Sequence, residues 1–311
     1  MMKRNNIVEM VKRGSKLVDE KQYFNYPITE VIKRRISVRT YEPQPLSVEN
    51  KRKIMEFIDD TTGPFTPKVR FELIDDLSVA ENTGKKIGTY GVIRGAKTYI
   101  LVAVERGDGD LEQVGYILEK VILFATSLGL GTCWLGGTFK REGFERLLEL
   151  KDQEYMPVIT PIGYPQNKKS LIDNIVRFAA GSNKRLKWEQ LFYKETLDTP
   201  LLKEEISQQY AIALEMVRMA PSASNKQPWR VVKEKDQFHF YLQRNKGYNK
   251  TLGFDIQRID IGIAMCHFEM TINNHGLTGE WINDGGTKAG MQLEQMEYIT
   301  SFNINSSIIE S

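Results

Sequence analysis

Two long apolar segments constrain the fold of this chain more than any other feature. Residues 111–128 and 256–273 both have helical spacing, and the first is apolar around most of its circumference, which indicates a buried helix. A Gly-Leu step follows each segment, and glycine at that place is common helix-stop chemistry. The two helices and their exits align without a gap, and five positions match at one offset (262 − 115 = 147). These are Gly115 with Gly262, Gly129 with Gly276, Leu130 with Leu277, Trp134 with Trp281, and Leu135 with Ile282.

The matches have two explanations. Similar helix-stop chemistry could have arisen twice, or the chain could contain a duplicated unit, which we favour because the matches lie in register. The period is too long for a solenoid, so we expect two related α/β halves packed as an internal pseudo-dimer around the long buried helices. We expect an N-terminal helical arm over residues 1–26, a first half over 27–195 and a second half over 196–311, joined by a polar linker at 194–200.

Composition excludes several classes of function. With 311 residues, the chain can bury a large core. The net charge is only +3, with basic and acidic residues interspersed, so we expect no nucleic-acid partner. Two cysteines without a CxxC spacing, and three histidines without a metal-binding spacing, argue against a disulfide scaffold or a zinc site. We see neither a signal peptide nor a membrane span, so we expect a cytoplasmic protein with no membrane partner.

Residues 34–39, Arg-Arg-Ile-Ser-Val-Arg, have the composition of a phosphate clamp. In an extended backbone, Arg35, Ser37 and Arg39 point to one side, and Ile36 and Val38 point to the other. Guanidinium forks and a short hydroxyl match phosphate geometry, and the apolar back can pack on a core. Taken alone, the segment is more simply explained as the solvated basic end of a helix. The choice between this explanation and a phosphate clamp depends on motifs elsewhere in the chain.

The most specific string of the sequence is Pro-Ser-Ala-Ser-Asn-Lys-Gln-Pro-Trp at residues 221–229. Its simpler explanation is a polar helix-stop turn. The string closely resembles the Pro-Ser-x-x-Asn-x-Gln-Pro-Trp segment of the nitroreductase family, the FMN-dependent oxidoreductases with an α+β fold. Residues 34–39 resemble that family's Arg-Arg-Ser-Val-Arg motif with one isoleucine inserted, and residues 129–137 resemble its Gly-Leu-Gly-x-x-Trp segment. The Gly-Tyr-Pro turn at 163–165 also fits, and the resemblance covers most of residues 27–300.

In this family, FMN lies at the interface of a homodimer, and each subunit supplies one side of the site. Here the two motifs are split between the halves. The first half has Gly-Pro-Phe-Thr-Pro at 63–67 where the Pro-Ser string would stand, and the second half has no phosphate motif. We therefore expect one chain to supply both sides of a single flavin site, and the second pseudo-site to be empty.

The resemblance also implies roles for individual residues. Arg35 and Ser37, next to Arg34, would hold the FMN phosphate. Arg185 would complete this clamp, although an exposed charge explains it equally well. Arg39 would lie nearer the pyrimidine edge of the flavin, where a cation stabilises the charge that develops on reduction. The other expected cofactor-binding residues are Leu135, Gly136 and Gly137 by their backbone N–H groups, and Pro221, Ser222, Ala223, Ser224, Asn225 and Gln227 beside the ring.

The resemblance implies an FMN-dependent NAD(P)H oxidoreductase that needs no side-chain nucleophile. NADH or NADPH would reduce the flavin, and a small-molecule electron acceptor such as a nitroaromatic or a quinone would then take its place in ping-pong order. Two alternatives stay open: a flavin-binding protein with little turnover, and a flavin dehydrogenase or dehalogenase on the same scaffold. We expect a monomer that acts as a pseudo-dimer, with a swapped homodimer as the alternative.

Overall fold

The computed structural model describes residues 23–75, 89, 91–137, 139–166, 185–245, 252–283 and 296–305. Most of the expected N-terminal arm lies outside these residues. At its end, Tyr23 and Phe24 pack edge-on against Phe57 and Phe124, which stack on each other with ring centroids 4.4 Å apart. The fold mixes helices with two separate sheets, in agreement with the expected α+β class.

The first sheet has the strand order β1-β2-β5-β3, and β4 pairs with β2. All its pairs are antiparallel. Its strands are β1 (Val69–Asp75), β2 (Thr98–Glu105), β3 (Gly131–Thr132), β4 (Glu154–Tyr155) and β5 (Ile159–Gly163). The central strand β2 is buried on both faces, as its continuous apolar run predicts. Alternate residues of β2 belong to two different core clusters, because successive side chains point to opposite faces.

The second sheet has the order β10-β11-β9-β8-β6-β7. Its strands are β6 (Phe192–Lys194), β7 (Thr196–Pro200), β8 (Trp229–Glu234), β9 (Gln237–Gln243), β10 (Gly279–Ile282) and β11 (Met296–Ile304). Strand β6 runs parallel to β8, and the other pairs are antiparallel. The expected linker at 194–200 is therefore wrong, because it contains the edge strand β7. Only Leu197 of this strand is buried, so its sequence looks polar.

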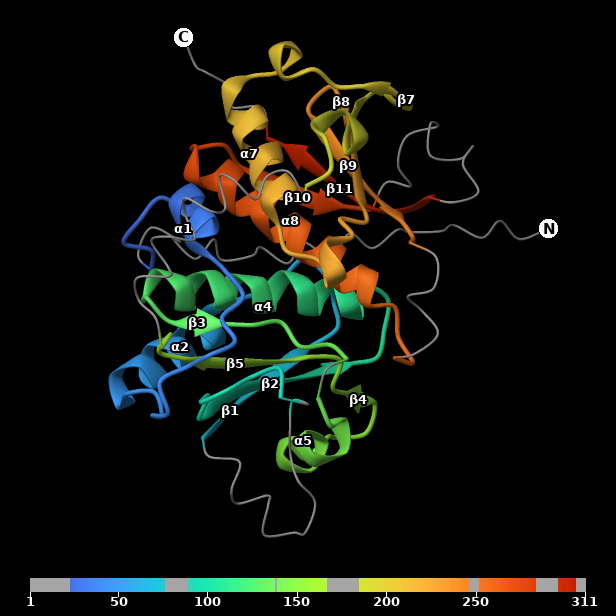
Figure 1. The fold of residues 1–311 in the computed structure, drawn as a ribbon. Coiled ribbons are helices and arrows are strands. Elements are labelled where there is room, and N and C mark those ends of the chain that lie inside the picture. The colour runs from blue at the N-terminus through green and yellow to red at the C-terminus, as the bar shows by residue number, and fades with distance from the viewer. Residues whose placement is uncertain are drawn as a thin grey trace, which may run out of the picture.

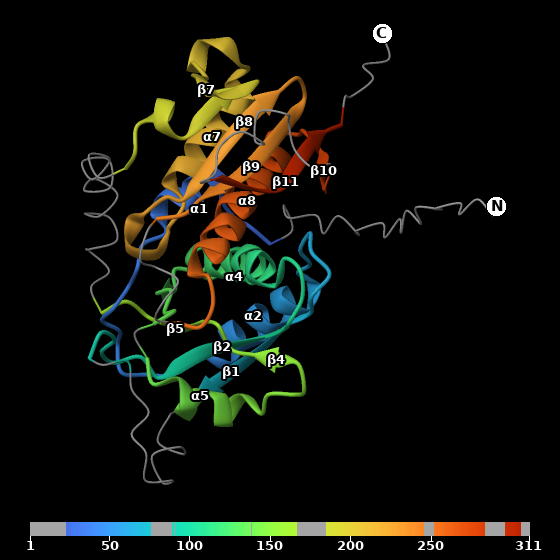
Figure 2. The ribbon, with the colours of Figure 1, turned by 90° about the vertical axis from the view of Figure 1, so that its right-hand side faces the viewer.

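Helices fill the space between the two sheets (Figure 1). The longest are α4 (Asp110–Ser127) and α8 (Ile256–Asn274), which confirm the two predicted helices. They cross between the sheets, and the view in Figure 2 shows the same arrangement from the side. The other helices are α1 (Ile28–Arg34), α2 (Val48–Asp60), α5 (Arg141–Leu148) and α7 (Gln208–Met219), with short 3-10 turns η3 (Trp188–Gln190), η4 (Lys203–Glu205) and η5 (Ala223–Asn225).

Two glycines allow the close approach of α4 and α8. A Cβ atom on Gly115 would lie 2.1 Å from the carbonyl oxygen of Ile259, and 3.1 Å from the Cα of Gly262. A Cβ atom on Gly262 would lie 2.0 Å from the carbonyl oxygen of Glu112. The two glycines that the repeat aligns therefore lie against each other at the crossing of the helices.

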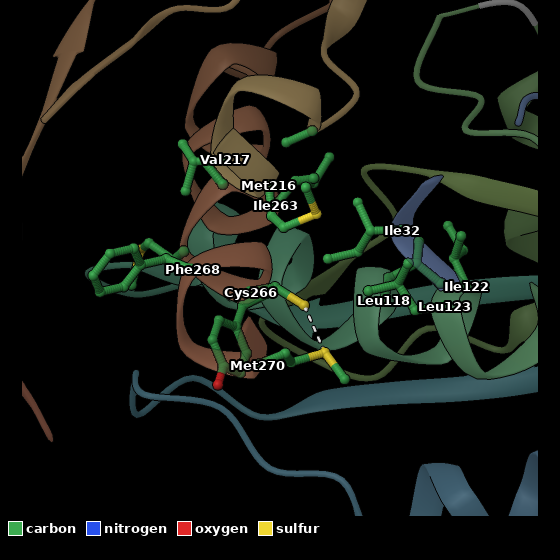
Figure 3. Packing of buried hydrophobic residues seen from close by; sticks show 14 of the residues in the cluster. Ile32, Leu118, Ile122, Leu123, Met216, Val217, Ile263, Cys266, Phe268 and Met270 are labelled. Atoms are coloured by element: carbon green, nitrogen blue, oxygen red, sulfur yellow. Dashed lines mark hydrogen bonds between the residues drawn. The ribbon is translucent and has the colours of Figure 1, made fainter. Parts of the chain in front are cut away.

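Apolar side chains from four helices make the core around this crossing. Figure 3 shows Ile32 of α1, Leu118 and Ile122 of α4, and Val217 of α7 beside residues of α8. Cys266 is fully buried there, with its sulfur 3.6 Å from that of Met270. Cys133 is also buried, and both cysteines are free thiols.

Candidate functional site

The segment 34–39 leaves α1 in an extended conformation and lies beside β3. Arg35 ends the helix with φ −63° and ψ 122°, and Ser37 forms a parallel bridge with Thr132. Val38 is buried and Ile36 is partly buried in the same apolar cluster, as alternation predicts. The residues on the polar side of the segment differ in exposure. Arg35 is only 7% exposed, whereas Ser37 and Arg39 are exposed.

Three of the four polar residues of this segment, Arg35, Ser37 and Arg39, influence the thiol of Cys133, which directly follows β3. Burial raises the pKa of Cys133, while Arg39, a hydrogen bond with Ser37, and Arg35 oppose the rise. The expected grouping of these three side chains is therefore present. Arg34 is turned elsewhere, since its guanidinium lies 4.2 Å from the centre of the Tyr26 ring.

Arg35 faces a fully buried carboxylate on α4. Its Nε lies 3.7 Å from Oε1 of Glu119, which is an ion-pair distance and too long for a hydrogen bond. Glu119 also accepts from Trp134 Nε1 at 2.8 Å, and its Oε1 lies 2.9 Å from His267 Nε2. Glu119 thus links α1 of the first half to α8 of the second.

Arg185 is not an exposed charge. Its two Nη atoms donate to the carbonyls of Ala220 at 2.6 Å and Met219 at 2.8 Å, where α7 ends. Burial lowers the pKa of Arg185 to about 10, and the charges of Arg35 and Arg218 contribute to this shift. Arg185 and Arg35 are 150 positions apart in the chain (185 − 35 = 150), yet they lie close enough for the charge of Arg35 to lower the pKa of Arg185.

The loop at 221–227 has an unusual backbone. Ser224, Asn225 and Gln227 all have positive φ, at 47°, 56° and 49°. Left-handed conformations cost energy for residues with a side chain, and such residues gather at functional sites. Ser222 accepts two hydrogen bonds within this loop: Asn225 N donates to Ser222 O at 2.9 Å, and Gln227 N donates to Ser222 Oγ at 2.9 Å.

Within this loop the structure separates exposed from buried residues. Ser224 and Asn225 are exposed, and Pro221, Ser222 and Ala223 are partly exposed. Gln227, which we expected beside the flavin ring, is instead 1% exposed. Its Oε1 accepts from Leu186 N at 3.0 Å, so it braces the loop against the segment that carries Arg185.

Asp260 of α8 holds the loop at 221–227 through a hydrogen bond to its backbone. Its Oδ1 accepts from Ala223 N at 2.9 Å, while its Oδ2 is buried without a partner among the described residues. Burial raises the pKa of Asp260 well above its usual value, with the Ala223 N–H acting in the opposite direction. Gln113 of α4 lies at the equivalent position of the repeat (260 − 113 = 147), and it accepts from Phe65 N at 2.9 Å. In each long helix, the side chain at this equivalent position therefore holds one loop by accepting a backbone hydrogen bond.

The glycine segment reaches the start of α8. A Cβ on Gly136 would lie 2.5 Å from Ile256, and one on Gly137 would lie 2.9 Å from Leu252. Gly137 is exposed, Gly136 is partly exposed, and Leu135 is buried. Arg141 Nη2 donates to the carbonyl of Gly136 at 3.0 Å and fixes this turn. The segment of the first half and the loop of the second half thus both contact the first turns of α8.

Sequence reasoning missed Glu119, His267 and Asp260. Their signal was available, because each is a titratable residue on a helix whose buried residues are mostly apolar. The sequence does not show which residues these three side chains contact, because their partners come from distant parts of the chain. Among the described residues, no group of three His, Cys, Asp or Glu side chains could hold a metal ion. No helix in the described ranges is both long and apolar enough to cross a bilayer.

Comparisons with known proteins agree with this description. A family model described as “Putative TM nitroreductase” matches residues 27–272. The crystal structure of a “putative nitroreductase” from Thermotoga maritima has a TM-score of 0.58 at 19% identity. The match covers 89% of this chain and 94% of that one, and it shows a shared fold.

Two shorter structures also match. A nitroreductase family protein from Clostridium novyi NT has a TM-score of 0.37 at 20% identity, over 46% of this chain and 88% of its own. An FMN-dependent nitroreductase from Clostridium difficile R20291 has a TM-score of 0.37 at 20% identity, over 44% and 87%. No curated protein matches the chain significantly. Because the family model spans most of its length, the chain belongs to the nitroreductase family that this model describes.

Proposed function

We propose that the chain is an FMN-dependent NAD(P)H oxidoreductase that reduces nitroaromatic, quinone or similar small acceptors. In this proposal both halves supply one flavin site, with the phosphate held by the first half and the ring bordered by the second. The observation that carries the proposal is that Arg35 lies close enough to Arg185 for their charges to repel, while Arg185 binds the carbonyls of Met219 and Ala220 directly before the strained loop at 221–227.

The cation cluster fits a phosphate group. Arg185 hydrogen-bonds to two neutral carbonyls, so its charge is not balanced by these contacts. Arg35 lies close enough to lower the pKa of Arg185, because like charges repel. A phosphate dianion would relieve this repulsion, and guanidinium forks match its oxygens. Arg35, Ser37 and Arg185 are therefore the residues that would hold the phosphate.

The opposite end of the site fits a flat polar ring. Ser224 and Asn225 present exposed polar atoms on a backbone held in left-handed conformations. Gly136 and Gly137, from the first half, permit close backbone approach because they carry no side chain. FMN, when bound, supplies electron transfer between a nicotinamide and an acceptor. The residues of the chain would orient the ring and leave one face for the nicotinamide and the acceptor in turn, which favours ping-pong order.

We further propose that the two halves are copies that pack as an internal pseudo-dimer. Gly115 contacts Gly262 at the helix crossing, which is expected for equivalent residues near a two-fold axis. Trp134 Nε1 donates to Glu119 of its own long helix, and Trp281 Nε1 donates to Glu269 of its own. In the described part of the chain, the second half has no basic segment equivalent to residues 34–39, which supports one flavin site.

Absorption spectroscopy and light scattering on one purified sample test this proposal. We expect a yellow protein with one FMN per chain and the mass of a monomer. NADH or NADPH should bleach the flavin, and a quinone or nitroaromatic should restore its colour over many cycles. Two flavins per chain would contradict the single site. Bound flavin that no nicotinamide reduces would favour a flavin-binding protein, and loss of flavin on dilution of a dimer would favour a swapped assembly.

A further inference from the structure

A buried histidine connects both halves to the charge of Arg35. His267 of α8 is fully buried, and its two ring nitrogens each have one partner. Its Nδ1 lies 2.9 Å from the carbonyl oxygen of Met216 on α7, and its Nε2 lies 2.9 Å from Oε1 of Glu119 on α4. The charged or titratable groups of this cluster are Arg35, Glu119 and His267.

These two contacts determine where the protons lie. The Met216 carbonyl can only accept a hydrogen bond, so Nδ1 of His267 carries a proton. Nε2 and Oε1 cannot both present lone pairs to each other at 2.9 Å, so a second proton lies between them. Either the imidazole is charged beside a carboxylate, or a neutral imidazole faces a carboxylic acid. In both states the pair of Glu119 and His267 has no net charge.

This neutrality changes the interpretation of the contact between Arg35 and Glu119. At 3.7 Å, a lone carboxylate of Glu119 would balance the charge of Arg35, but His267 has already cancelled the charge of Glu119. Among the described residues, Arg35 makes no other ion pair. Its positive charge therefore remains available, and so do its two Nη atoms, because the contact with Glu119 is made by Nε.

The other half offers an internal comparison. Glu269 accepts from Trp281 Nε1 at 2.5 Å, as Glu119 accepts from Trp134, and its partner across the helix crossing is the hydroxyl of Tyr116. A tyrosine hydroxyl donates a hydrogen bond without cancelling a carboxylate charge at neutral pH. Of these two glutamates, Glu119 is the one that is paired with an imidazole and lies beside a guanidinium of the phosphate clamp.

From this geometry we infer that His267 is a positioning residue: it shares the proton that neutralises Glu119, and so keeps the charge of Arg35 available for the phosphate end of the cofactor. This inference rests on the proposed function. It differs from a purely structural role for His267, in which only the hydrogen bond to Glu119 would matter and the charge would not.

The test compares the affinities for FMN and riboflavin, which differ only in the phosphate. His267→Gln keeps an N–H toward Glu119 but cannot carry the proton, so Glu119 would compete for Arg35. We expect the FMN-to-riboflavin affinity ratio to fall about tenfold or more, as for a lost hydrogen bond to a charged group. Glu119→Gln should keep the ratio within about twofold, because a neutral side chain replaces a neutral pair.

The double variant Glu119→Gln with His267→Gln decides between charge and structure. If charge matters, the second substitution restores the ratio to within about threefold of the unaltered chain, although both hydrogen-bonding partners have changed. A ratio as low as in His267→Gln alone, or lower, would overturn the inference. Glu269→Gln, which changes the carboxylate that Trp281 binds in the other half, is the matched control and should leave the ratio unaltered. General damage to the fold would lower both affinities and leave their ratio unchanged.

Two further measurements do not depend on flavin. The ¹⁵N spectrum of the His267 ring should show a protonated Nδ1, and a bare Nδ1 would overturn the proton assignment. Titration of the same variants with inorganic phosphate should reproduce the order seen with FMN. If the unaltered chain binds neither flavin, the proposed function is wrong, and these two measurements still decide the inference.

Discussion

Replacing Gly262 with alanine should push the two halves of the molecule apart. The new Cβ would lie 2.0 Å from the carbonyl oxygen of Glu112 and 2.8 Å from Tyr116 N, and both atoms are backbone of α4. Ordinary contact begins at 3.4 Å, so α4 and α8 must separate locally by about 1.4 Å (3.4 − 2.0 = 1.4). A side chain could rotate away, but helical backbone cannot.

The expected cost follows from two opposing effects. Forcing an extra methyl group into a packed core costs about 3 kcal/mol at the upper end of the usual range. Alanine returns up to about 1 kcal/mol, because it is a better helix former than glycine. We therefore expect the free energy of unfolding to fall by about 2 kcal/mol. Gly115→Ala should behave alike, and both changes together should cost less than their sum, because one separation accommodates both.

Urea unfolding followed by circular dichroism measures this loss, and Gly276→Ala, just past the end of the same helix, is the matched control. Gly276 has φ +77°, and a methyl group added there would have no neighbouring atom within 4 Å. Its substitution should cost about 1–2 kcal/mol through backbone strain alone, without separating the helices or changing flavin affinity. A Gly262→Ala variant as stable as the unaltered chain, with unchanged flavin affinity, would refute the close-crossing argument.

Three further predictions concern the site. Arg35→Ala should weaken FMN binding by about 1.5–3 kcal/mol and riboflavin binding much less; unchanged FMN affinity in a titration would remove Arg35 from the site. Asn225→Ala should alter the visible spectrum of bound flavin at nearly unchanged stability, whereas Gln227→Ala should cost about 1–3 kcal/mol in urea, because it leaves Leu186 N without its acceptor. An Asn225→Ala protein with an unaltered spectrum and NADH reduction rate would argue against the cross-half site. Burial raises the pKa of Asp260, so the folded chain keeps a proton that the unfolded chain loses above about pH 4, and stability falls as pH rises. Asp260→Asn removes this effect, and its stability relative to the unaltered chain should increase in urea melts as the pH rises above about 4; a constant difference would contradict the raised pKa.

The sequence predicted those parts of the fold that local pattern determines. The helices α4 and α8 and the central strand β2 are visible in it because apolar residues recur at helical spacing or without interruption. The strand β7 is not visible, because it lies at a sheet edge and buries only Leu197. Its conformation depends on pairing with β6, and such pairing is a property of the folded chain.

For the candidate site, motif strings selected Arg35, Arg185 and the loop that contains Asn225, and the roles of these residues stay predictions. The same strings placed Gln227 beside the ring, whereas in the structure it is buried and accepts from Leu186 N. An amide side chain has the same sequence signature whether it faces a ligand or braces a loop. Glu119 and His267 had no motif at all. Their importance comes from the ion pair of Glu119 with Arg35 and from the proton that Glu119 shares with His267. Glu119 and His267 are 148 positions apart, and only the packing of α4 on α8 brings them into contact.

The comparison of Gln113 with Asp260 indicates what each half contributes. Both side chains accept from the backbone of a loop that precedes the next strand, so the tether itself belongs to the fold. Positive φ at residues with side chains occurs in the second loop, and among the described residues of the first loop there is none. The cations show the reverse distribution, since the motif 34–39 belongs to the first half. If the halves are copies, as we propose, each has kept the helix crossing and the tether. In the proposed site, each half would contact one end of the cofactor, and neither half alone would have a complete site. Such a chain would not work as two independent halves, because the contacts of Glu119 with Arg35 and with His267 join the motif 34–39 to the core of the other half.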